Sequence, residues 1–122
     1  MTVKEIGQHI SNAASGITGT TYPEFTGHLP LSVKKGICYT IKSAVLGNTF
    51  GMGAAFSITL RSEKHDELIE HASALRKNIA GNFPDTITAE IPEQDFSVEG
   101  VKGAFRWIWE TSFDIIITAT EG

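Results

Sequence analysis

The chain has 122 residues, of which 41% are hydrophobic and 20% charged, a composition that predicts one globular domain with a single core. Its formal net charge of −4 argues against nucleic acid or an anionic membrane as the main partner. We expect no signal peptide, because Lys4 and Glu5 precede any apolar run. We also expect no transmembrane helix, because no apolar run approaches the ~20 residues that a membrane span needs.

The chain begins with a pattern typical of an amphipathic helix over residues 2–14. Thr2 and Glu5 have the spacing of a capping box. Gly7 lies inside this helix, where glycine costs about 1 kcal/mol relative to alanine, so packing must hold it. The apolar residues that recur at helical spacing are Val3, Ile6, Ile10, Ala13 and Ile17. Two glycines end the pattern, Gly16 and Gly19.

Residues 18–35 are expected to form an irregular loop, because Pro23, Gly27 and Pro30 interrupt any regular pattern. Such a long connection is usually functional, partner-facing or disordered. Three apolar side chains are expected to pin it to the domain: Tyr22, Phe25 and Leu29.

Two alternating stretches, Ile37 to Val45 and Ala54 to Arg61, predict an antiparallel hairpin. The glycine-rich segment Gly47 to Gly53 between them lacks the lysine and the following helix of a phosphate-binding loop, so it is interpreted as a flexible hairpin tip. Cys38, the single cysteine, excludes an internal disulfide. We expect it to be a buried strand residue and a poor nucleophile, in a reducing cytoplasm.

A second helix is predicted to follow Ser62, which is a favourable N-cap, and to stop at Gly81. Its apolar residues repeat at intervals of four, three and four: Leu68, Ala72, Leu75 and Ile79. Several possible metal ligands lie on this helix: His65, Asp66, Glu67, Glu70 and His71. The two histidines are about 240° apart around the helix, so they cannot share a site. Glu67 and His71 could pair, but we expect the group to be a solvated helix surface.

The alternation of Ile87, Ala89 and Ile91 predicts a short third strand, and residues 92–104 are acidic and turn-rich. From Phe105 to Ala119, apolar residues occupy nearly every odd position, which predicts a strand with one buried face. Fifteen extended residues reach roughly 50 Å, more than such a domain's diameter of roughly 35 Å. We therefore expect a bend or bulge at Thr111–Ser112, or else a strand end that leaves the domain and meets another subunit.

The sequence thus predicts an α+β fold with a mostly antiparallel sheet of about four strands. Two helices pack on one face of this sheet, in the order α-β-β-α-β-β. The aromatic stripe of the last strand could stack on single-stranded nucleic acid, but a buried core face, part of it at a subunit interface, is favoured.

The order of elements resembles that of the tail-terminator proteins of long-tailed bacteriophages and their prophage relatives. The resemblance rests on the N-terminal helix, the Pro/Gly-containing loop, the hairpin, the segment SITLRSEKHDELIEHASALRKNIAG and the terminal FRWIWETSFDIIITAT. It implies a structural, ring-forming subunit, usually a hexamer, which caps the tail tube and joins it to the head connector. It also implies a virion component assembled in the bacterial cytoplasm. DNA would pass through the ring without specific binding, and no enzymatic activity, catalytic residue, metal or cofactor is expected.

Three other functions remain open. One is another head–tail joining or tail-tube subunit. The second is a small α+β enzyme or ligand-binding domain with a pocket near His28 and the Gly47–Gly53 loop. The third is a nucleic-acid-binding module. For the assembly function, the residues expected to contact neighbouring copies or partners are Phe50, Met52, Trp107, Trp109, Tyr22 and Phe25.

Overall fold

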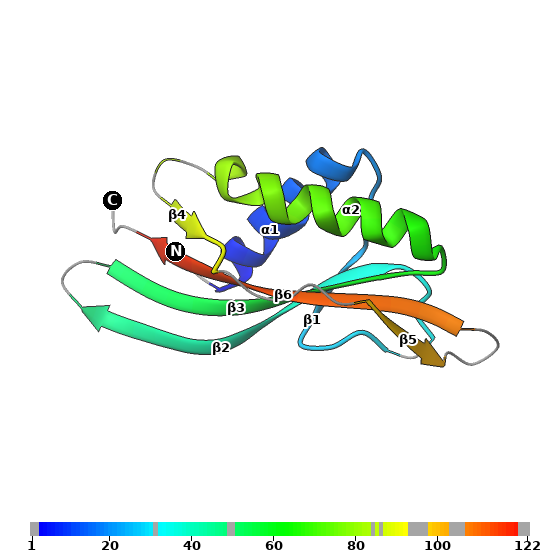
Figure 1. Cartoon of the computed structure of the whole chain (residues 1–122). Helices are drawn as coiled ribbons and strands as arrows, with labels where there is room; N and C mark the ends of the chain where they lie inside the picture. Colours follow the sequence, from blue (N-terminus) through cyan, green and yellow to red (C-terminus); the bar gives the residue numbers. More distant parts are fainter. Residues whose placement is uncertain are drawn as a thin grey trace.

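The computed structural model describes residues 3–30, 32–48, 51–83, 85, 87–92, 98–102 and 107–119. Its elements in chain order are α1 (Val3–Thr18), β1 (Glu24–Thr26), β2 (Gly36–Asn48), β3 (Gly51–Ser62), α2 (His65–Asn78), the 3-10 helix η1 (Ile79–Asn82), β4 (Ile87–Glu90), β5 (Glu99–Lys102) and β6 (Trp107–Ala119). The fold is α+β, and both helices lie on the same side of the sheet (Figure 1).

The strands form one mixed, six-stranded sheet in the order β1-β2-β3-β6-β4, with β5 pairing alongside β6. β1 runs parallel to β2, and the other pairs are antiparallel. The α+β class is therefore confirmed, but the sheet has six strands where about four were expected. The additional strands, β1 and β5, lie in the segments 18–35 and 92–104, which were expected to be irregular.

α1 is longer than its apolar pattern predicted. It continues past Gly16 to Thr18, and Gly19 then takes a positive φ of 72° with its N–H donating to the Ser15 carbonyl. A positive φ favours glycine, so Gly19 ends the helix and Gly16 does not. Thr2, the first residue of the expected capping box, lies outside the described residues.

α2 begins at His65, with Lys64 as its N-cap, so the prediction that Ser62 caps the helix is wrong. Ser62 instead ends β3, and its hydroxyl accepts a hydrogen bond of 3.2 Å from the Lys64 N–H. Gly81 is not a helix stop, because the chain tightens into η1 after Asn78. The apolar spacing is confirmed: Leu68, Ala72, Leu75 and Ile79 are all fully buried.

The β2–β3 hairpin is confirmed, but its strands extend into the glycine-rich segment. Gly51, Met52 and Gly53 belong to β3, and Asn48 pairs with Gly51, so the predicted flexible tip over residues 47–53 is wrong for these positions. Register shifts interrupt the pairing between Ile41 and Ser43 and between Val45 and Asn48. At this end, the sheet projects beyond both helices (Figure 1).

β6 is one continuous strand, and the bend expected at Thr111–Ser112 is absent. Its pairing with β3 runs from Met52–Ala119 to Ser62–Trp109 without a register shift. The strand curves gradually with the twisted sheet, which accommodates its length without a bulge (Figure 1). The predicted alternation holds along this strand, where Phe113, Ile115 and Ile117 face the core.

The core lies between the two helices and the face of the sheet that they cover. α1 contributes Ile6, Ile10, Ala13 and Ala14, and α2 contributes its buried apolar stripe. The main sheet residues of the core are Ile37, Tyr39, Phe56, Ile58, Leu60, Phe113, Ile115 and Ile117. Burying each large side chain contributes roughly 1.5–3 kcal/mol, so this layer supplies most of the stabilisation.

Gly7 explains how closely α1 approaches the sheet. A Cβ atom built on Gly7 would lie within bonding distance of the Tyr39 ring, so only glycine leaves room for that ring. The packing of Tyr39 against the bare helix backbone compensates for the low helix propensity of Gly7.

Candidate functional site

The six residues expected at an interface lie in different environments. Phe50 lies outside the described residues. Met52 pairs with Ala119, and Trp107 pairs with Lys102, through their strand backbones. The burial of the other three side chains, Tyr22, Phe25 and Trp109, determines how much of their aromatic surface a partner could contact.

Tyr22 is 1% exposed and belongs to the core, so it offers no surface to a partner. Phe25 is half-buried in β1, where its ring lies against Gly36. Trp109 is also half-buried, packs against the core, and forms an edge-to-face contact with His65, with 4.6 Å between ring centroids. Of these three described side chains, Tyr22 is therefore wholly buried within the chain, and Phe25 and Trp109 are partly buried within it.

The outer edge of β2 is the longest strand edge without a strand partner in the described part of the chain. β1 pairs only with Ile37, Cys38 and Tyr39. Among the described residues, no strand lies beside β2 on that side from Thr40 to Asn48. Ile41, on this edge, is 43% exposed. We call the stretch from Thr40 to Asn48 the β2 outer edge.

The face of the sheet opposite the helices carries polar side chains in cross-strand pairs. Thr59 and Ser112 share a hydrogen bond of 2.7 Å between their hydroxyls. Lys42 Nζ donates to Asp114 Oδ2 at 2.8 Å, which directs the lysine across the sheet instead of outward from the β2 outer edge. This helix-free face is hereafter the open face.

Arg61 fastens the loop between β1 and β2 over one end of the open face. Its side chain is only 4% exposed and binds Glu110 Oε2 at 2.9 Å through Nη2. The same guanidinium donates to three loop carbonyls, those of Leu29, Pro30 and Val33. A planar guanidinium with five donors suits this arrangement of acceptors. Arg61 is therefore a structural latch for residues 27–35.

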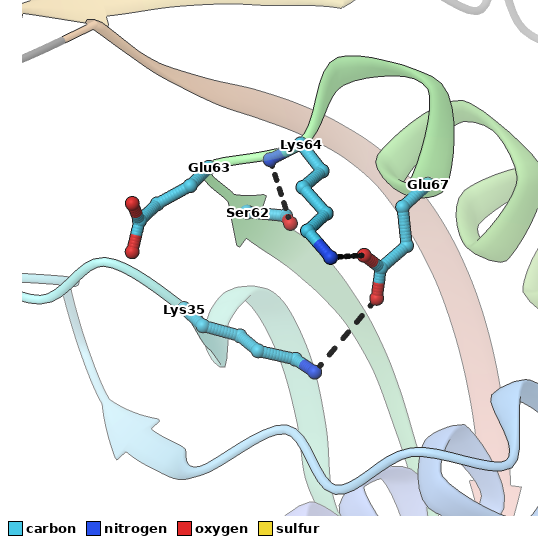
Figure 2. Close-up of a pocket in the computed structure, with 5 residues that line it drawn as sticks. All are labelled: Lys35, Ser62, Glu63, Lys64 and Glu67. Carbon is cyan, nitrogen blue, oxygen red and sulfur yellow. Dashed lines mark hydrogen bonds and ion pairs between the residues drawn. The ribbon is translucent and has the colours of Figure 1, made fainter.

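A shallow hollow of ≈ 390 Å³ opens at the start of α2 (Figure 2). It is lined by Lys35, Ser62, Glu63, Lys64 and Glu67. The Glu67 carboxylate lies 4.0 Å from Lys35 Nζ and 3.9 Å from Lys64 Nζ. At these separations the charges form loose ion pairs, which are worth little on a solvated surface.

A hydrogen bond close to Glu67 joins the loop after α1 to α2. Tyr22 Oη and His71 Nδ1 are 2.6 Å apart, and His71 Nδ1 is 3.9 Å from Glu67 Oε1. Burial, and secondarily the Glu67 carboxylate, raises the pKa of Tyr22 to about 12. Glu67 and His71, whose spacing allowed a pair, thus lie close together. His65, Asp66 and Glu70 are exposed as expected, but His71 is not a solvated surface residue.

The structure does not bring together the residues of the alternative pocket. His28 is exposed beside Gly27, whose N–H bonds to the Tyr39 carbonyl. The glycine-rich segment begins at Gly47, at the far end of β2, and extended chain from Tyr39 to Asn48 spans roughly 30 Å. His28 is also not among the residues that line the hollow.

The described residues contain no cluster of three or more histidine, cysteine, aspartate or glutamate side chains placed to hold a metal ion. Cys38 is buried, as expected. Burial raises the pKa of its thiol, which disfavours the thiolate that nucleophilic chemistry needs.

Sequence reasoning missed two polar contacts, the Arg61 latch and the Tyr22–His71 hydrogen bond. Each joins residues far apart in the chain, so no spacing motif marks it. The available signal for the latch was a pair of opposite charges, Arg61 and Glu110, within two long strands. Their side chains point away from the apolar face of those strands.

Within the described residues, no helix combines the length and the apolar character needed to cross a membrane. A scan against protein-family models finds no match, and a search of curated proteins finds none either. One solved structure matches with a TM-score of 0.43 and 11% sequence identity, and the match covers 96% of this chain and 93% of that one. A likeness of this degree is too distant to support a functional argument.

Proposed function

We propose that the chain is a ring-forming structural subunit of the tail-terminator type. In this proposal it caps the tail tube of a long-tailed phage or prophage and joins the tube to the head connector. The observation that supports the proposal best is the β2 outer edge, a long strand edge without a strand partner among the described residues.

A long strand edge offers a row of main-chain N–H and C=O groups to another strand. Natural proteins usually guard such edges with outward-pointing lysines, and Lys42 lies on this one. The Lys42 ammonium, however, is bonded to Asp114 over the open face, while the neighbouring Ile41 is exposed. This arrangement favours addition of a strand from a second copy.

In the proposed ring, usually a hexamer, the neighbour's strand satisfies the β2 outer edge. The projecting end of the sheet and the loop over residues 27–35 are then available to the tail-tube and head-connector proteins. The net charge of −4 is compatible with a channel through which DNA passes without binding, since an acidic wall repels phosphate. The open-face ion pairs and the hollow need no catalytic role in this mechanism.

The proposal is tested by light scattering and native mass spectrometry of the purified protein, followed by negative-stain imaging. We expect closed rings, together with an end-on complex when preformed tail tubes are added. A protein that stays monomeric at high concentration and binds no tail-tube protein would contradict the proposal. Incorporation along the tube, in place of capping at one end, would instead identify a tail-tube subunit.

A further inference from the structure

The two flanks of the sheet carry opposite charge. We define the β1–β2 flank as the described residues from 24 to 48, and the β4–β5 flank as those from 85 to 102. The first holds Lys34, Lys35 and Lys42 against a single acid, Glu24. The second holds Asp85, Glu90 and Glu99 against a single base, Lys102. One flank is therefore net basic and the other net acidic.

Several of these charges are available to a partner. Lys34, Glu90 and Glu99 are exposed, and none has an ion-pair partner within the part of the chain that the structure describes. Lys35 and Lys42 are paired within the chain, with Glu67 and Asp114 respectively. The Lys42 side chain is nevertheless 55% exposed, so its charge still contributes to the field at that flank.

The strand order places the two flanks at opposite sides of the sheet. β1 and β2 stand at one end of the order, while β4 and β5 both pair with β6 at the other. Within the described residues, neither β4 nor β5 has a second strand partner. Each flank therefore combines a strand edge with a characteristic charge.

From this juxtaposition we infer that copies of the chain associate head to tail, with the β1–β2 flank of one copy against the β4–β5 flank of the next. The inference rests on the proposed function and specifies the interface of the ring. A heterologous contact joins a basic flank to an acidic one, and its repetition closes a ring. A two-fold contact would oppose like charges, which disfavours association.

Charge reversal on one flank at a time tests the direction of assembly. Lys34→Glu with Lys42→Glu makes both flanks acidic, and the pair Glu90→Lys with Glu99→Lys makes both flanks basic. Each variant alone is expected to raise the subunit dissociation constant roughly tenfold, measured by sedimentation, because like charges then meet at every interface. Lys77→Glu and Glu70→Lys, on exposed positions of α2, are controls for net charge and should assemble normally.

Two rescue experiments distinguish head-to-tail from two-fold contacts. A chain carrying all four reversals has its flank charges exchanged, and it should assemble like the native chain. An equimolar mixture of the two single-flank variants should also assemble, with the two kinds of chain alternating around the ring. Native mass spectrometry of mass-labelled chains shows whether they alternate.

The oligomeric state of the native chain shows whether a negative result contradicts this inference alone or the proposed function as well. A monomeric native chain overturns both. A native ring whose flank variants assemble normally, or whose exchanged-charge chain is not rescued, overturns the head-to-tail inference and leaves the ring intact. Loss of assembly in the α2 controls has the same meaning, because net charge would then explain the effect.

Discussion

Individual residues determine how closely the layers of this fold approach each other, and Gly7 is the sharpest case. The Tyr39 ring occupies the space where a Cβ atom would lie. On helix propensity alone, Gly7→Ala should stabilise α1 by about 1 kcal/mol. The overlap should outweigh this gain, because the ring or the helix must shift, at a cost of typically 1–3 kcal/mol.

We therefore expect Gly7→Ala to lower the free energy of unfolding, measured by urea denaturation. Gly16→Ala is the matched control in the same helix, since no atom lies within 4 Å of the Cβ position there. That change should be neutral or stabilising. Equal stabilisation by both substitutions would contradict the packing role assigned to Gly7.

Tyr22 predicts a stability change in alkaline solution. Its pKa is raised from 10.0 to about 12 in the folded chain, so the folded state holds the phenol proton after the unfolded state has lost it. The resulting stabilisation is fully present below pH 10 and is lost as pH rises toward 12. Comparison with Tyr22→Phe isolates this effect from other groups that titrate in the same range.

At neutral pH, Tyr22→Phe should cost about 1–3 kcal/mol, because it leaves His71 without its 2.6 Å hydrogen bond. The difference in unfolding free energy between the native chain and Tyr22→Phe should then shrink between pH 10 and 12. A difference that stays constant across this range would show that Tyr22 ionises equally in both states.

Breaking the Arg61–Glu110 ion pair should cost much more stability than breaking the Lys42–Asp114 ion pair. Arg61→Met removes a buried partner of Glu110 and of three loop carbonyls, and we expect a loss of about 3–5 kcal/mol. Lys42→Met breaks the exposed pair with Asp114 and should cost less than about 1 kcal/mol. Hydrogen exchange should also accelerate in residues 27–35 of the Arg61 variant, and unchanged protection there would contradict the latch.

At the scale of elements, α2 depends on its apolar stripe. Leu75 is fully buried between the helix layer and the sheet, so Leu75→Asp loses apolar burial and places an unpaired carboxylate in the core. The expected cost of about 4–5 kcal/mol or more approaches the whole stability of a small domain, and a thermal melt should show no folded transition. Lys77→Asp, exposed on the same helix, should melt close to the native chain.

The elements that the sequence predicted are those whose own side chains define a buried face. Two periodic patterns were sufficient to predict α2 and β6, because one buried face requires a helical period in a helix and alternation in a strand. They are the helical spacing of Leu68, Ala72, Leu75 and Ile79 and the alternation of Phe113, Ile115 and Ile117. β1 and β5 were missed because they are short and form only by pairing with β2 and β6. The Thr111–Ser112 bend was wrong because gradual curvature of the sheet replaced a local bulge.

For the candidate site, the sequence indicated aromatic residues but not where they would be used. Tyr22 and Trp109 were expected at an interface, yet Tyr22 is buried within the chain and Trp109 packs on His65 and the core. Apolar character predicts burial, but it does not say whether the covering surface belongs to the same chain. The β2 outer edge could not be foreseen, because it depends on β1 stopping after three pairs.

At the scale of the whole molecule, the helices cover one face of the sheet, while no described helix or strand covers the open face or the β2 outer edge (Figure 1). If copies associate through that edge, a charge placed on it should act like the lysines that guard natural sheet edges. Ile41→Lys is therefore expected to raise the dissociation constant of the assembly roughly tenfold without unfolding the subunit. Ile116, which is exposed to nearly the same degree, lies on β6 away from this edge and supplies the control.

Sedimentation of Ile41→Lys and Ile116→Lys over a range of protein concentrations measures the two effects together. Assembly lost only in the Ile41 variant assigns the contact to the β2 outer edge. Equal loss in both variants would move the contact to the open face, where Ile116 lies. Assembly that is retained equally by both variants would contradict edge pairing. In an edge-paired assembly, the ammonium of Ile41→Lys would be buried against the neighbouring strand without a partner, which would strongly weaken the contact.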